Sequence, residues 1–169
     1  MDTSTIGRLL HYHYRMFDQV WEYALPLTAD QFVAESDYSL RSVRNHLVHC
    51  MNVDARWLAR LMREALPARL NPLDYHDQNA VRLKWEIIRE RVLQYARDVP
   101  DVALNEPIWV DLPSRFPEPR PFRRWEILLH LANHGTDHRA QILARLHELG
   151  AKTFEQDLIL HWWTNGESA

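Results

Sequence analysis

The sequence predicts an all-α protein, a single four-helix bundle domain that occupies residues 1–169. Apolar residues recur every three or four positions over four long stretches, as they do on one face of an α-helix. Glycine is scarce, at four residues, whereas the chain holds seven tryptophans and ten histidines, so long helices with few tight turns are expected. Hydrophobic residues make up 46% of the chain, which suits one core at this length.

The first two long helices are predicted over residues 3–24 and 39–64, because their apolar side chains return to one helical face. Thr3 or Ser4 could cap the first helix. A short helical turn over residues 29–34 is expected between them. Ser39 or Ser42 marks the start of the second helix, and a proline-containing polar connection follows it.

The third long helix is predicted from about residue 78 to near Pro100, and the fourth from about 123 to 149, with Gly150 as its C-terminal stop. Between them, six prolines over residues 98–121 exclude a helix, because proline has no amide hydrogen to donate. We expect a long ordered Pro-rich loop there, with a short extended piece over 107–112. A last short helix, 154–163, is expected to pack across one end of the bundle.

Composition and charge exclude several classes of function. The formal net charge is only −3 and no basic cluster stands out, so nucleic acid is not expected as a partner. No segment is apolar enough to cross a bilayer, and the N-terminus does not resemble a secretion signal. The single cysteine, Cys50, cannot form an internal disulfide, which favours a reducing compartment and a cytoplasmic location. Cys50 lies on an apolar helix face, so it is expected to pack as a buried thiol rather than act as a nucleophile.

Two histidines on the fourth predicted helix could share a metal ion. His134 and His138 are four residues apart and both should point inward, so their imidazoles are neighbours on the helix surface. Such a pair is half of a metal site, and the alternative is two hydrogen-bonded core residues. Hydrogen-bonded core or rim positions are the preferred interpretation for His13, His46 and His130.

The second predicted helix also carries polar side chains near its apolar face. His49 lies at the flank of that face, His46 lies closer to the core, and Asp54 takes a core position. A buried carboxylate is costly without a partner. Asp54 is therefore expected to face a cation, a metal ion or an imidazole.

Two sequence segments resemble the DinB/YfiT-like family, a group of proposed metalloenzymes built on a four-helix bundle. Residues 128–143, LLHLANHGTDHRAQIL, are similar to the family's closing signature of His, three residues, and His-Arg-Gly-Gln. Residues 42–58, SVRNHLVHCMNVDARWL, match a pattern of serine, a histidine seven residues on, an acid five residues later and an aromatic residue. The resemblance covers most of the chain. It departs from the family where Ala140 replaces the usual glycine, Asp137 a frequent histidine and Asp54 the commoner glutamate.

The resemblance implies that His49, His134 and His138 bind one divalent metal ion. Imidazole ligands suit zinc, nickel, iron and copper alike, and we expect zinc or nickel, with iron as an alternative. Three neutral ligands leave an open coordination position, which is typical of catalytic sites. Relatives include transferases that use a low-molecular-weight thiol such as bacillithiol or mycothiol. We therefore expect thiol transfer to a small electrophile, with Asp54 as a catalytic residue that orients a ligand or accepts a proton.

Two other functions stay open at this stage, a non-catalytic metal-binding or stress-response bundle and a metal-assisted hydrolase. A small-molecule substrate and a homodimer are also expected from the resemblance. Trp57, Trp109 and Trp125 could wall a substrate cleft, although core packing is the favoured role for Trp57.

Overall fold

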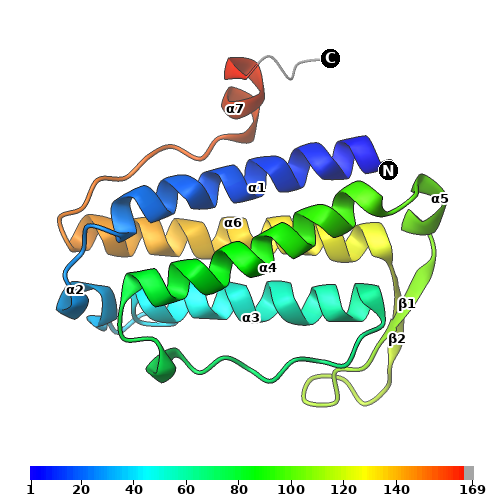
Figure 1. Ribbon diagram of the computed structural model, residues 1–169, viewed down its shortest axis with the longest axis horizontal. Helices are drawn as coiled ribbons and strands as arrows, with labels where there is room; N and C mark the ends of the chain where they lie inside the picture. The colour runs from blue at the N-terminus through cyan, green and yellow to red at the C-terminus, as the bar shows by residue number, and fades with distance from the viewer. Residues whose placement is uncertain (166–169) are drawn as a thin grey trace.

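Four long helices lie side by side in the computed structural model, which describes residues 1–165 (Figure 1). They are α1 (Thr3–Ala24), α3 (Val43–Met62), α4 (Gln78–Asp98) and α6 (Arg124–Glu148). Helices α1 and α3 each contact both α4 and α6, so apolar side chains of all four helices meet in one core. The predicted all-α four-helix bundle is confirmed. The last four residues of the predicted 1–169 domain lie outside the described part of the chain.

The helices in the first half of the chain are capped at their N-termini by short polar side chains. Asp2, rather than Thr3 or Ser4, caps α1, because its carboxylate accepts a hydrogen bond from the Thr5 amide at 2.7 Å. The short helix α2 (Ala29–Val33) fills the predicted turn. Ser42 caps α3, because its hydroxyl oxygen accepts a hydrogen bond from the Asn45 amide at 3.2 Å. Of the two candidates, Ser39 and Ser42, the second is therefore the cap.

A long connection over residues 63–77 follows α3 and contains only the single 3₁₀ turn η1 (Pro72–Asp74). Figure 1 shows that it runs back along the bundle before α4 begins. Consequently α4 runs in the same direction as α3, whereas α6 runs opposite to α3. Two hydrogen bonds between the Asn52 side chain and the Leu70 backbone attach this connection to α3.

The Pro-rich segment has more regular structure than the sequence predicted. It contains the short helix α5 (Asp101–Leu104) and an antiparallel hairpin of β1 (Pro107–Val110) and β2 (Arg120–Arg123). The extended piece predicted over 107–112 is confirmed as β1, but α5 and β2 were not predicted. Proline is tolerated at both places, because Pro100 stands before the first turn of α5 and Pro121 lies in an edge strand.

The C-terminal arm, residues 151–165, differs in part from the expectation. Gly150 ends α6 as predicted, with a left-handed φ of 78°. The last helix, α7 (Leu158–Thr164), starts later than predicted because Asp157 caps it by accepting two backbone amides. It stands roughly upright against the middle of α1 rather than across one end of the bundle (Figure 1), and none of its residues is buried. No helix in the described chain is long and apolar enough to cross a membrane.

A buried polar cluster joins α1, α6 and the C-terminal arm. The Arg139 side chain is 0% exposed and donates hydrogen bonds to His13 Nδ1 at 3.0 Å, Thr136 Oγ1 at 2.9 Å and Gln156 Oε1 at 2.9 Å. Burial, and then the Arg139 charge, hold the pKa of His13 well below its usual value, so His13 is neutral. The hydrogen-bonded core role predicted for His13 is confirmed.

One glycine makes this close approach of α1 and α6 possible. A Cβ atom placed on Gly135 would lie 2.0 Å from Cε1 and 2.6 Å from Nδ1 of His13. Any larger residue at this position would collide with an imidazole that Arg139 already holds in place. Gly135 therefore sets the spacing of α1 and α6 next to the turn that carries His134 and His138.

Candidate metal centre

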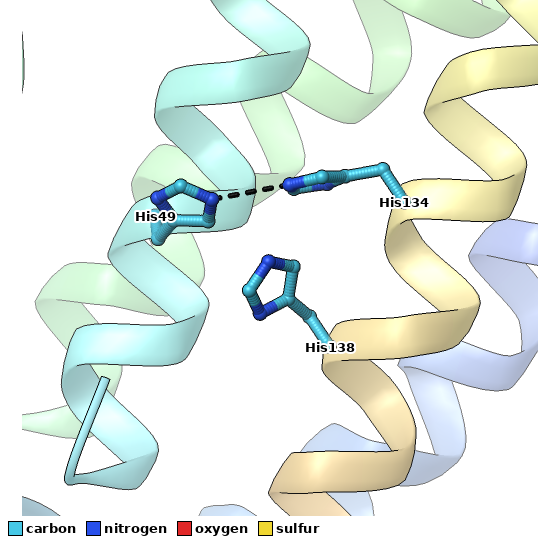
Figure 2. Close-up of side chains that lie close together, drawn as sticks. All are labelled: His49, His134 and His138. Atoms are coloured by element: carbon cyan, nitrogen blue, oxygen red, sulfur yellow. Dashed lines mark hydrogen bonds between the residues drawn. The ribbon is translucent and has the colours of Figure 1, made fainter. Parts of the chain in front are cut away.

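Three imidazoles from two helices converge at one point on the bundle. His134 and His138 lie one turn apart on α6, and His49 faces them from α3 (Figure 2). One nitrogen of each ring lies within 4.8 Å of the others, and His49 Nε2 is 3.1 Å from His134 Nε2. The structure thus brings together the three residues that the sequence resemblance implied as ligands.

The spacing of these nitrogens suits a divalent cation. Ligand nitrogens about 2.1 Å from a tetrahedral ion lie roughly 3.4 Å from one another. Ring centroids of the three histidines are 4.4 to 5.1 Å apart, and Figure 2 shows a His138 nitrogen directed toward the gap between the other two rings. The cluster could therefore hold one divalent metal with small side-chain adjustments.

The electrostatics of the cluster favour the neutral imidazole, which is the form that binds metals. Burial, followed by the neighbouring His138, lowers the pKa of His49 to about 4 and that of His134 to about 3. Burial also lowers the pKa of His138. All three rings are consequently neutral at pH 7, and each has one nitrogen without a proton that can bind a cation.

His46 lies behind the cluster and contacts one of its members. Its Nδ1 is 3.1 Å from Nδ1 of His138, and both rings are buried. This contact leaves Nε2 of His138 for a cation and can fix the orientation of that ring, as outer partners of metal ligands do. The hydrogen-bonded role predicted for His46 is confirmed, whereas His130 lies at the rim and packs against Trp57 and His134.

A cavity of about 420 Å³ opens beside the cluster, with His49 and His134 in its wall. This volume is in the range of small-molecule sites. Trp57 also lines it, while packing partly against the core. Trp109 is exposed and Trp125 packs against the core, so neither forms part of this wall.

Asp54 is buried on α3, and its carboxylate accepts a hydrogen bond from the Tyr14 hydroxyl at 2.9 Å. Its described hydrogen bond thus goes to Tyr14 and not to one of the three imidazoles. Burial raises the pKa of Asp54 to about 7. Its catalytic role stays a prediction.

Cys50, one turn earlier, is buried, and burial raises the pKa of its thiol well above the usual value, as expected for a packing residue.

The raised pKa of Asp54 predicts a pH-dependent effect of Asp54→Asn on stability. The unfolded chain ionises this carboxyl near pH 4, whereas the folded chain keeps it protonated up to about pH 7. The wild type therefore loses stability relative to the variant as pH rises from 4 to 7, by a total on the order of several kcal/mol. Urea unfolding of both proteins at several pH values measures the difference. A difference that is constant across this range would contradict the prediction.

Sequence reasoning missed four arginines that line the cavity, Arg56, Arg60, Arg69 and Arg115. Helical spacing could have indicated the first two, because they lie seven and eleven residues after His49 and so share its face. Arg69 and Arg115 lie in irregular connections, where periodicity gives no signal.

Comparison with known proteins agrees with the fold and the sequence signatures. A family model of the DinB family matches residues 1–168. The solved structure of a DinB-like protein from Bacillus cereus ATCC 10987 is similar, with a TM-score of 0.64 over 87% of this chain and 94% of that chain. The two sequences are 11% identical, so this likeness shows the fold alone. Among curated proteins, none matches this chain. On the strength of the match along nearly its whole length, this chain belongs to the DinB family.

Proposed function

We propose that the protein is a metal-dependent enzyme that activates a low-molecular-weight thiol for transfer to a small electrophile. The observation that carries the proposal is the convergence of three neutral imidazoles, two of which, His49 and His134, line a cavity of small-molecule size. Structural metal sites are usually closed by four protein ligands, whereas three ligands next to a cavity favour catalysis.

In this proposal His49, His134 and His138 hold the ion, with zinc or nickel favoured and iron as the alternative. A divalent ion in such a site supplies Lewis acidity that deprotonates a bound thiol or lowers the pKa of bound water. His46 orients His138, and Trp57 provides an apolar wall for the substrate. We retain Asp54 as the candidate proton acceptor, which a pKa of about 7 supports.

Two further expectations belong to the same proposal. A cytoplasmic location fits a chain whose single cysteine, Cys50, is buried and unpaired. A homodimer is proposed from the resemblance to the family, and sedimentation of the purified protein would test it.

A thiol-transfer assay tests the function. Wild-type protein loaded separately with zinc, nickel or iron is mixed with chlorodinitrobenzene and several thiols. Sulfur forms a bond to the aromatic carbon, chloride leaves with the electrons of the C–Cl bond, and the thiol proton passes to solvent. We expect turnover that His49→Ala lowers at least 100-fold, about the scale of losing an essential catalytic interaction. His76→Ala, an exposed histidine outside the cluster, should leave turnover unchanged.

The alternatives give different results in the same experiment. Stoichiometric metal without turnover of any thiol would favour a non-catalytic metal-binding bundle. Hydrolysis of an activated ester without added thiol, again lost in His49→Ala, would favour a metal-assisted hydrolase. Either result would contradict the proposed transferase.

A further inference from the structure

The cavity beside the three histidines has an unusual charge. Arg56, Arg60, Arg69 and Arg115 all line it, and its lining includes no aspartate or glutamate. The chain as a whole is acidic, with a formal net charge of −3. This local excess of positive charge next to the candidate metal centre is therefore not a reflection of composition.

None of these four arginines takes part in an ion pair among the described residues. Arginines elsewhere on the protein do pair with carboxylates, namely Arg41, Arg82, Arg89, Arg91, Arg97, Arg124 and Arg145. Arg56 donates to the Pro67 carbonyl at 2.6 Å, and Arg60 donates to the Arg56 carbonyl at 3.1 Å. Carbonyl groups hold these two side chains in place without neutralising their charge.

The arginines surround the cavity from three segments. Arg56 and Arg60 follow His49 along one face of α3, at roughly 10 Å and 16 Å from it along the helix axis. Arg69 comes from the connection over residues 63–77, and Arg115 from the loop between β1 and β2. Segments distant in sequence thus place guanidinium groups around one space.

Collecting like charges is unfavourable, and the Asp111 carboxylate, which raises the pKa of Arg60, offsets the repulsion only in part. The guanidinium of Arg60 stacks over the Trp57 ring at 5.0 Å, and burial, followed by the Arg56 charge, lowers its pKa. A bound anion would relieve this repulsion. Guanidinium groups bind carboxylates and phosphates through paired hydrogen bonds, which is why clusters of arginine recognise such ligands.

We propose that this cavity binds a small ligand with two or more carboxylate or phosphate groups, held by Arg56, Arg60, Arg69 and Arg115 beside the metal centre. The inference rests on the proposed function and deepens it, because it states that the thiol or its electrophilic acceptor is an acid. The ligand's negative groups lie toward the arginines, and its reacting atom lies toward His49 and His134.

Binding of simple anions tests the arginine-lined site independently of any reaction. Isothermal titration calorimetry compares succinate and inorganic phosphate with the neutral analogue succinamide, on metal-free and zinc-loaded protein. We expect succinate or phosphate to bind at least 10-fold more tightly than succinamide binds, and the affinity to fall as salt is added. Arg69→Gln and Arg115→Gln should each weaken anion binding about 10-fold or more, the scale of a charge-assisted hydrogen bond. Both side chains are exposed, so the variants should fold.

Arg97→Gln is the matched control, because Arg97 is an exposed arginine on α4 that pairs with Glu90 outside the cavity lining. It should leave anion binding unchanged. Equal binding of succinate and succinamide, or no effect of the two cavity variants, would overturn the inference. Tight binding of a single-stranded oligonucleotide with no binding of succinate would also overturn it.

The thiol-transfer assay separates this inference from the proposed function and assigns the charge. A lower KM for mercaptosuccinate than for uncharged mercaptoethanol, lost in Arg69→Gln, would place the acid on the thiol. A lower KM for an acidic electrophile than for a neutral one, again lost in Arg69→Gln, would place the acidic group on the acceptor. Anion binding without turnover would support the arginine-lined anion site and contradict the proposed enzyme. Turnover with no preference for charged substrates would support the enzyme and contradict the anion site.

Discussion

His138→Ala is expected to leave the purified protein without a stoichiometric metal ion. His138 is the most buried of the three candidate ligands, at 8% exposure, and His46 contacts its Nδ1. Removing it leaves two imidazoles, and the loss of affinity should exceed the 10–100-fold that is typical for mutation of an outer partner. Elemental analysis after loading with zinc or nickel and desalting measures the ion content of wild type and variant.

The control for this experiment is His147→Ala, an exposed histidine on the same helix. It should retain one ion per chain, like the wild type. If His138→Ala also retained one ion per chain, the three-histidine centre would be wrong, and the proposed enzyme would lose its basis.

Gly135→Ala is expected to destabilise the bundle by about 3 kcal/mol or more, the upper range for overpacking a core. The added methyl group would lie 2.0 Å from Cε1 of His13, a distance that atoms do not tolerate without movement. His13 cannot easily move, because Arg139 binds both its ring and its carbonyl oxygen. Urea unfolding gives the change in the free energy of unfolding.

A second variant shows whether the collision is the cause. In the double variant His13→Ala with Gly135→Ala, the imidazole is gone, so the two changes should cost clearly less than the sum of their separate effects. Gly7→Ala is the matched control, because a methyl group on this helical glycine of α1 meets no atom within 4 Å. It should be neutral or stabilising by up to about 1 kcal/mol. Additive effects at positions 13 and 135 would contradict the steric explanation.

The sequence was sufficient to predict the four long helices, because each carries a continuous apolar face and an identifiable start or stop. Residues 3–24 were predicted with the bounds that the structure shows, and Gly150 was identified as the end of α6. The histidine cluster could also be predicted, since His134 and His138 are neighbours on any helix and the family signature indicates His49.

Features that depend on how distant segments meet could not be predicted in this way. The pairing of β2 with β1 depends on the loop returning along the first strand, and the prolines of this segment, Pro121 among them, excluded only a helix. The contact between His46 and His138 depends on the rotation of α3 against α6. Likewise, the cavity gathers Arg69 and Arg115 from two irregular connections whose paths local patterns do not determine.

The attachment of the C-terminal arm has a consequence for how the protein opens. Its helix α7 buries no residue and meets α1 through the Arg8 guanidinium over the Trp162 ring. The segment before α7 is held more firmly, because Phe154 packs against the core and Gln156 accepts a hydrogen bond from Arg139. Segments with few buried apolar contacts unfold locally at a small fraction of the global free energy. We therefore expect α7 to open before the four helices do, and opening that reached Gln156 would remove one hydrogen-bond partner of Arg139.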